Sequence, residues 1–170
     1  MQTEAVSSNK GKNRMSMFLT IKNATPSDLA KIKNFREKDE RGKSYLQIAI
    51  HARPELVPYL LEFDVDIDNQ DLRTKSTALQ YTLELPRRDL AELLLEKGAN
   101  VNIVDKYGNG ALWVALFNAA KDYSLVKKIL EKGGDPHHKN KVGKSPFDMA
   151  VTRKEDEIIR YFESHALKTG

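Results

Sequence analysis

The segment LLLEKGANVNIVDKYGNGALWVAL, Leu93–Leu116, has the pattern expected for the end of one helix, a loop and the start of another helix. Lys97 falls in the last helical turn, where a cation favours the negative helix end, and Gly98 stands where a left-handed cap is needed. A short extended run leads to Asp105 and Gly108, which are turn residues. Apolar residues then return at helical spacing. The segment therefore predicts a junction between two helical repeats.

The loop and second helix of this segment belong to a set of four similar segments. DERGKSYLQIAI, DLRTKSTALQYTL, DKYGNGALWVAL and NKVGKSPFDMAV begin at residues 39, 71, 105 and 140. Their matching apolar residues, Leu46, Leu79, Leu112 and Phe147, are separated by 33, 33 and 35 positions. A second apolar cluster follows each segment, as in the run Leu93–Leu95. Each period is therefore expected to hold two short helices and a hairpin-like loop.

A period of 33 residues with these motifs resembles the ankyrin repeat, and LAELLLEKGANVN and DKYGNGALWVAL are its best matches. The resemblance covers residues 39–165 and implies an all-α solenoid of helix-turn-helix units joined by β-hairpin-like loops. The family's histidine in T-P-L-H is replaced here, so we expect the side-chain hydrogen bonds between successive turns to be altered or missing. The replacing residues are Gln47, Gln80, Trp113 and Asp148.

The expected organisation is a disordered tail at 1–14, a divergent N-terminal capping helix pair at 15–38, and a C-terminal tail at 167–170. Between them lie four repeats, at about 39–70, 71–104, 105–139 and 140–166. Lys75 is expected as a one-residue insertion at a hairpin tip, and Phe117–Ser124 carries two extra residues between helices. Because no unit buries its apolar face alone, the array is stabilised by contacts between neighbours.

The composition excludes several classes of protein. The 170 residues contain no cysteine, which excludes disulfides and thiolate catalysis. The apolar runs are too short to cross a bilayer, and the N-terminus lacks the apolar region of a signal peptide, so a cytoplasmic location is expected. The net charge of +4 is mild for a nucleic-acid binder. We therefore expect neither membrane nor nucleic-acid binding.

The sequence offers no convincing catalytic, cofactor or metal site. His137 and His138 are adjacent and lack a third ligand at short spacing, which favours loop residues over a metal site. Gly108 and Gly110 flank Asn109, but a turn already explains these glycines. No serine motif typical of a nucleophile is present. We therefore predict a non-catalytic protein without a cofactor.

In the ankyrin family, partners generally meet the hairpin tips and the concave inner helices. Carried over to matching positions, this implies a partner-binding set comprising Arg41, Lys43, His51, Leu72, Arg73, Lys75, Glu84, Lys106, Tyr107, Asn109, Trp113, Phe117, Asn118, Lys141, Lys144 and Arg153. Basic residues dominate the tips and favour a partner with an acidic surface, although solvated tips are commonly charged in any case. Tyr107 is interpreted mainly as a contact residue, and Trp113 mainly as a packing residue.

These observations predict a protein-protein interaction module that is monomeric when unbound. The style of its repeats is similar to that of short bacterial ankyrin proteins, some of which are cytosolic immunity proteins. The specific hypothesis is thus an inhibitor that blocks a cognate toxin or enzyme through its tips and concave face. An intracellular scaffold or adaptor that binds peptides or a regulatory partner is the alternative.

Overall fold

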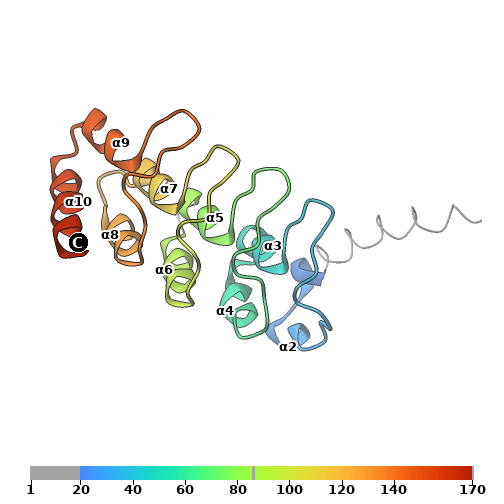
Figure 1. Cartoon of the computed structure of the whole chain (residues 1–170). Coiled ribbons are helices and arrows are strands. Elements are labelled where there is room, and N and C mark those ends of the chain that lie inside the picture. The colour runs from blue at the N-terminus through green and yellow to red at the C-terminus, as the bar shows by residue number, and fades with distance from the viewer. Residues whose placement is uncertain (1–19, 86, 170) are drawn as a thin grey trace, which may run out of the picture.

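The computed structural model describes residues 20–85 and 87–169, which form a stack of helix pairs (Figure 1). Residues 20–23 are helical, and the expected tail at 1–14 lies outside the described residues. The helices that follow are α2 (Pro26–Leu29), α3 (Tyr45–Ala52), the short 3-10 helix η1 (Pro54–Leu56), α4 (Val57–Leu60), α5 (Ala78–Glu84), α6 (Arg88–Glu96), α7 (Ala111–Asn118), α8 (Ser124–Glu131), α9 (Pro146–Arg153) and α10 (Asp156–Thr169).

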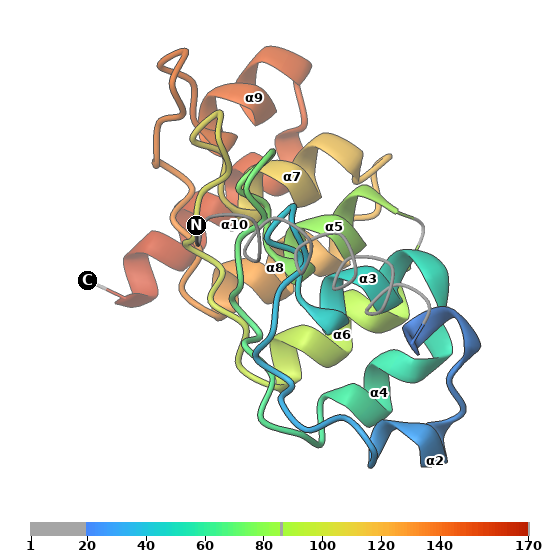
Figure 2. The same ribbon diagram turned by 90° about the vertical axis from the view of Figure 1, so that its right-hand side faces the viewer.

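The helices form two layers. The inner layer contains α3, α5, α7 and α9, and the outer layer contains α4, α6, α8 and α10 (Figure 1). Each inner helix contacts its neighbours in the layer, and each pairs with the outer helix that follows it. The loop before each inner helix projects to one side, so the four loops stand in a row (Figures 1 and 2). The expected all-α solenoid is confirmed, and no named strand occurs in the described residues.

The inner helices begin at capping boxes. The Gln47 N–H donates to Ser44 Oγ at 3.3 Å, and the Ser44 N–H donates back to Gln47 Oε1 at 3.0 Å. This exchange satisfies donors that a helix start otherwise leaves unpaired. Thr77 and Ser145 begin α5 and α9 in the same way. Gly110, which precedes α7, has no side chain for such a bond.

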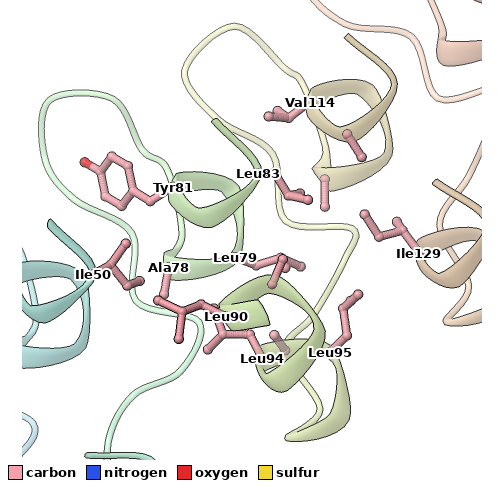
Figure 3. Close-up of a cluster of buried hydrophobic side chains, with 14 of the residues drawn as sticks. Ile50, Ala78, Leu79, Tyr81, Leu83, Leu90, Leu94, Leu95, Val114 and Ile129 are labelled. Atoms are coloured by element: carbon pink, nitrogen blue, oxygen red, sulfur yellow. The ribbon is translucent and has the colours of Figure 1, made fainter. Parts of the chain in front are cut away.

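The core lies between the layers. Leu79 of α5 meets Leu90 and Leu94 of α6, and all three side chains are at most 3% exposed (Figure 3). Val114 of α7 and Ile129 of α8 continue the same apolar contact into the next repeat (Figure 3). Burying one such side chain contributes about 1.5–3 kcal/mol to folding. The continuity of this cluster explains why a repeat is stable only beside its neighbours.

Glutamine replaces the family histidine at the first joint, the boundary between an inner helix and the next hairpin. Gln47 Nε2 donates to the Asn69 carbonyl at 3.0 Å and to the Ser76 carbonyl at 2.9 Å. Gln47 is fully buried, so its amide bonds two turns inside the array. Of the two expected outcomes, altered or missing bonds, the first joint shows altered ones, because a carboxamide carries two N–H donors and can bond two carbonyls.

The second joint repeats this arrangement and the third departs from it. Gln80 Nε2 donates to the carbonyls of Ile103 at 3.3 Å and Asn109 at 2.8 Å. Trp113 occupies the corresponding position at the third joint, where it packs partly buried against the core. Among the described residues it forms no side-chain hydrogen bond to the next hairpin. Asp148 caps its own helix instead, by accepting from the Ser145 N–H at 2.9 Å.

The irregular loops coincide with the insertions expected from the sequence. Lys75 adopts φ +57° at the tip, where the other three turns use glycine. Ala120 and Lys121 adopt φ +45° and +72° in the longer connection between α7 and α8. Left-handed backbone is unfavourable for residues with a Cβ, so both loops hold strained geometry. The two insertions therefore change loop shape without interrupting the stack.

The two ends of the array differ. At the start, Phe35 stacks on Phe63 with ring centroids 4.2 Å apart, so an irregular segment covers the first repeat. At the other end, α10 buries Ile158 and Phe162 against the last repeat. This helix continues to residue 169, so residues 167–169, which were expected in a C-terminal tail, are helical. Among the described residues, no helix is long and apolar enough to cross a membrane.

Candidate binding surface

The tips of neighbouring hairpins are joined by main-chain hydrogen bonds. The N–H of Leu72 donates to the Arg41 carbonyl at 2.8 Å, and the N–H of Lys106 donates to the Thr74 carbonyl at 2.9 Å. The N–H of Lys141 continues the series by donating to the Tyr107 carbonyl at 2.9 Å. A ligand that crosses from one tip to the next therefore meets one connected surface.

An acidic or amide side chain at the base of each tip shapes its turn. Asp71 is the most buried of them, and it accepts hydrogen bonds from the main-chain N–H groups of Arg73 and Thr74 at 2.8 Å each. The Thr74 and Tyr81 hydroxyls also donate to it. Burial alone would raise the pKa of Asp71, but these donors outweigh it and lower the pKa to about 2. The carboxylate is thus part of the turn and is unavailable to a ligand.

Basic and apolar side chains share the tips. Leu72, Tyr107 and Val142 are 63%, 59% and 77% exposed. The Lys106 ammonium lies over the Tyr107 ring, 4.9 Å from its centroid. Large exposed apolar groups beside cations can supply both contact area and long-range attraction to a partner. Val142, which was absent from the predicted set, extends this surface to the last repeat.

The ends of the inner helices supply a second row of side chains. His51 meets the Tyr81 ring edge-on, with centroids 5.0 Å apart, and the Lys43 ammonium lies 4.8 Å from the centre of the same ring. Burial, followed by the nearby Lys43 charge, lowers the pKa of His51. Burial also raises the pKa of Glu84, with help from the charges of Asp105 and Asp71. Tyr81 therefore organises a polar cluster between the first two repeats.

The corresponding end of α7 is more apolar. Phe117 is 58% exposed, and the Arg153 guanidinium lies 5.1 Å from its ring centre. Arg153 also donates to the carbonyls of Leu116 and Phe117 at 3.3 and 3.4 Å, which hold its guanidinium against the ring. Val151 is 51% exposed on the next helix and was missed by the sequence interpretation. In the repeat alignment Val151 is equivalent to Leu116, which is buried, so the sequence pattern alone predicts that Val151 is a core residue.

The predicted partner-binding residues divide by exposure. Those that are exposed are Arg41, His51, Leu72, Arg73, Lys75, Glu84, Tyr107, Phe117, Asn118, Lys141, Lys144 and Arg153, and those that are partly buried are Lys43, Lys106, Asn109 and Trp113. Asn109 already bonds within the array, because its Nδ2 donates to Asp105 and its Oδ1 accepts from Asn140 at 2.9 Å. The Asn109 side chain therefore stabilises its own turn and links it to the next hairpin.

Within the described part of the chain, no group of three or more histidine and acidic side chains could hold a metal ion. His137 and His138 both lie in the last hairpin loop, and His138 Nε2 is 3.0 Å from the Gly108 carbonyl. That carbonyl can only accept, so Nε2 is the donor and the ring joins two hairpins.

Comparison with known proteins agrees with the geometry. A family profile described as ankyrin repeats in three copies matches residues 5–105 and 47–140. The chain belongs to the ankyrin repeat family. Ankyrin repeats generally bind proteins and are typically non-catalytic, which fits the exposed tips and the inner-helix surface described above.

Several curated relatives match most of the chain. An intracellular phospholipase A2 of Caenorhabditis elegans is 30% identical over 162 residues, which is 87% of this chain and 15% of the relative. The ankyrin repeat protein FPV031 of fowlpox virus is 30% identical over 79% of the chain and 41% of its own length. The mouse B-cell lymphoma 3 protein homolog is 30% identical over 76% of the chain and 29% of its length. This chain therefore corresponds to less than half of each relative.

Proposed function

We propose that this ankyrin domain binds one folded protein through its hairpin tips and the adjacent ends of its inner helices. The observation that carries the proposal is the connected row of tips, on which exposed Leu72, Tyr107 and Val142 alternate with cations. Tyrosine and arginine are enriched among residues that dominate binding energy. The surface thus combines apolar anchors with a positive field.

The expected partner presents an acidic surface. Every repeat contributes basic side chains to the tips. The first, second and fourth repeats contribute exposed ones, Arg41, Arg73, Lys75, Lys141 and Lys144, and the third contributes the partly buried Lys106. Acidic groups at the base of the tips are occupied by their own turns, as the bonds to Asp71 and Asp105 illustrate. The outward charge is therefore mainly positive and would accelerate association with an acidic partner at low salt.

The specific form of this proposal is a stoichiometric inhibitor, for example an immunity protein of bacterial type that covers the active site of a toxin or enzyme in the cytoplasm. An inhibitor of this kind should bury roughly 800 Å² on each partner and dissociate slowly. The alternative is a scaffold that binds several short peptides weakly. Stoichiometry and off-rate, measured on the purified complex, distinguish the two forms.

The test begins with affinity capture and mass spectrometry, using the wild-type chain and a variant with Tyr107→Ala and Lys106→Glu. The proposal expects a stable protein partner that is lost or weakened with the double variant. A matched control carries Tyr59→Ala and Lys132→Glu, which change an exposed tyrosine and an exposed lysine away from the tips. Equal loss with both variants, or retention with both, would contradict the assignment of the surface.

Nucleic acid is the competing ligand for a basic surface. Binding to phosphates would weaken steeply with salt, in proportion to the number of phosphates contacted. Titration with duplex DNA and with RNA at about 0.1 M salt separates the cases. We expect negligible binding there, and submicromolar binding would replace the protein partner with a nucleic acid.

A further inference from the structure

The third joint lacks the side chain that completes the first two. At the second joint, the Gln80 carboxamide makes three bonds at once: its Oε1 accepts from the Thr77 N–H at 2.9 Å, and its Nε2 donates to the Ile103 and Asn109 carbonyls. Gln47 makes the same set of bonds at the first joint. One primary carboxamide therefore satisfies one main-chain donor and two main-chain acceptors at each joint.

The corresponding groups at the third joint are the Gly110 N–H and the carbonyls of His138 and Lys144. They occupy the same positions relative to the helix start and the turn as their counterparts at the second joint. Among the described residues, no side chain bonds to any of these three groups. The Lys144 carbonyl accepts only the Asn140 N–H of its own hairpin, at 2.9 Å.

A cavity of about 250 Å³ lies at this joint. Gly110, Trp113 and His138 are among its lining residues, and Leu112 and Pro146 add apolar wall. Among the described residues, no side chain caps the Gly110 N–H at the start of α7. Since drug-sized pockets occupy roughly 300–1,000 Å³, this cavity suits a small molecule or one inserted side chain.

We propose that the third joint binds a primary carboxamide supplied by another molecule. Its oxygen accepts the Gly110 N–H, and its apolar part lies against Trp113. Its NH₂ group donates to the His138 carbonyl and, by equivalence with the Asn109 carbonyl at the second joint, to the Lys144 carbonyl. The ligand would thus make, from the cavity beside Trp113, the bonds that Gln47 and Gln80 make within the chain at the other two joints.

Other polar groups match this site less well. A carboxylate would direct negative oxygens at two carbonyls and towards Asp135, which also lines the cavity. An ammonium group has no acceptor for the Gly110 N–H. The His138 Nε2 is already bonded to the Gly108 carbonyl, so the ring offers a ligand no further donor, and Nδ1 and the main-chain carbonyl of this residue are both acceptors. The donor and acceptor pattern therefore selects the carboxamide.

The test is an NMR titration with benzamide of the ¹⁵N-labelled full chain. The chain has one tryptophan, so the Trp113 indole N–H gives a single signal. We expect saturable shifts of this signal and of the Gly110 amide, with a Kd on the order of millimolar for so small a probe. Gly42, which belongs to the first hairpin and does not line the cavity, supplies a reference amide that should not shift.

Matched probes isolate the carboxamide. N,N-dimethylbenzamide and benzoate keep the ring but cannot donate to the carbonyls, and we expect at least about tenfold weaker binding, since two hydrogen bonds are lost. Equal binding of all three probes would overturn the proposal, as would the absence of saturable shifts with benzamide. N-acetylglutamine and N-acetylglutamate repeat the comparison for a protein side chain. Stronger binding of N-acetylglutamine than of benzamide would identify a protein side chain as the natural ligand, and the reverse would identify a small molecule.

Two variants complete the experiment. Trp113→Gln supplies the chain's own carboxamide, so the Gly110 amide should no longer respond to benzamide. Trp113→Phe retains an aromatic wall without a carboxamide and should still bind it. Unchanged benzamide binding by Trp113→Gln, or loss of binding by a folded Trp113→Phe protein, would contradict the assignment. None of these results depends on whether the tips bind a protein.

Discussion

Replacing Gln80 by alanine tests the energetic role of the joint glutamines. The side chain is 1% exposed and makes hydrogen bonds of 3.3 and 2.8 Å to two carbonyls and one of 2.9 Å to the Thr77 N–H. At about 1 kcal/mol net for each bond, Gln80→Ala should lower the free energy of unfolding by about 3 kcal/mol. The unpaired carbonyls and the vacated space act in the same direction.

The assay is urea unfolding followed by far-UV circular dichroism. Gln80→Glu is the matched variant, because it retains the oxygen that accepts from Thr77 but cannot donate to the two carbonyls. We expect it to be at least as destabilising as the alanine variant near pH 7. A loss below about 1 kcal/mol in both variants would refute the idea that the glutamines hold successive hairpins together.

Four further predictions concern other parts of the array. Trp113→Gln should raise the free energy of unfolding by about 1–2 kcal/mol, because three new bonds of about 1 kcal/mol each outweigh the lost packing of the partly buried indole. The same urea unfolding measures it, and a net loss would contradict the equivalence of the joints. Asp71 has a folded pKa of about 2, below its ordinary 3.8, so its stabilising effect is full above about pH 4 and is lost as the pH falls towards 2. In the Asp71→Asn variant, the free energy of unfolding should therefore depend less on pH between about pH 4 and 2. An unchanged pH profile would refute the role of the carboxylate. Gly108→Ala should destabilise the protein more than Gly98→Ala does. Both glycines adopt positive φ, but only a Cβ at position 108 meets main-chain atoms, 3.0 Å from Lys141 N. Equal falls in the melting temperature of the two variants would contradict this. Arg36→Ala should leave the midpoint of urea unfolding nearly unchanged despite the 2.6 Å pair with Asp64, because both side chains are largely exposed, and a clear fall in the midpoint would contradict this.

The repeat architecture could be predicted from the sequence because it rests on local signals. Gly98 does adopt a left-handed conformation, with φ +84°, and Ser145 does cap an inner helix. The 33-residue spacing places equivalent apolar residues such as Leu79 and Leu112 in equivalent buried positions. These features depend on neighbours in the chain, so a single sequence contains them.

The joints could not be predicted because they depend on groups far apart in the sequence. Gln47 bonds to carbonyls 22 and 29 residues away, and only the folded stack brings these together. The family's histidine was therefore a misleading guide, since glutamine can take over its bonding. Exposure at Val151 also depends on the stack, because its position in the repeat matches the buried Leu116.

The binding surface could be predicted from the sequence only in part. The tip positions of Tyr107 and Lys106 follow from the repeat register, whereas the inward bonds of Asn109 required the structure. Residue type alone does not distinguish a polar side chain that bonds within the array from one that faces a partner. Binding experiments must therefore compare tip residues with exposed residues elsewhere.

The most direct test is the affinity of the captured protein partner for two charge-reversed variants, measured by isothermal titration calorimetry. One variant carries Arg41→Glu, Lys106→Glu and Lys141→Glu at the tips, and the other carries Lys33→Glu, Lys132→Glu and Arg160→Glu at exposed positions elsewhere. Both change the net charge equally. Binding through the tips predicts a loss of at least about tenfold for the first variant only, and equal affinities of the two variants would contradict it.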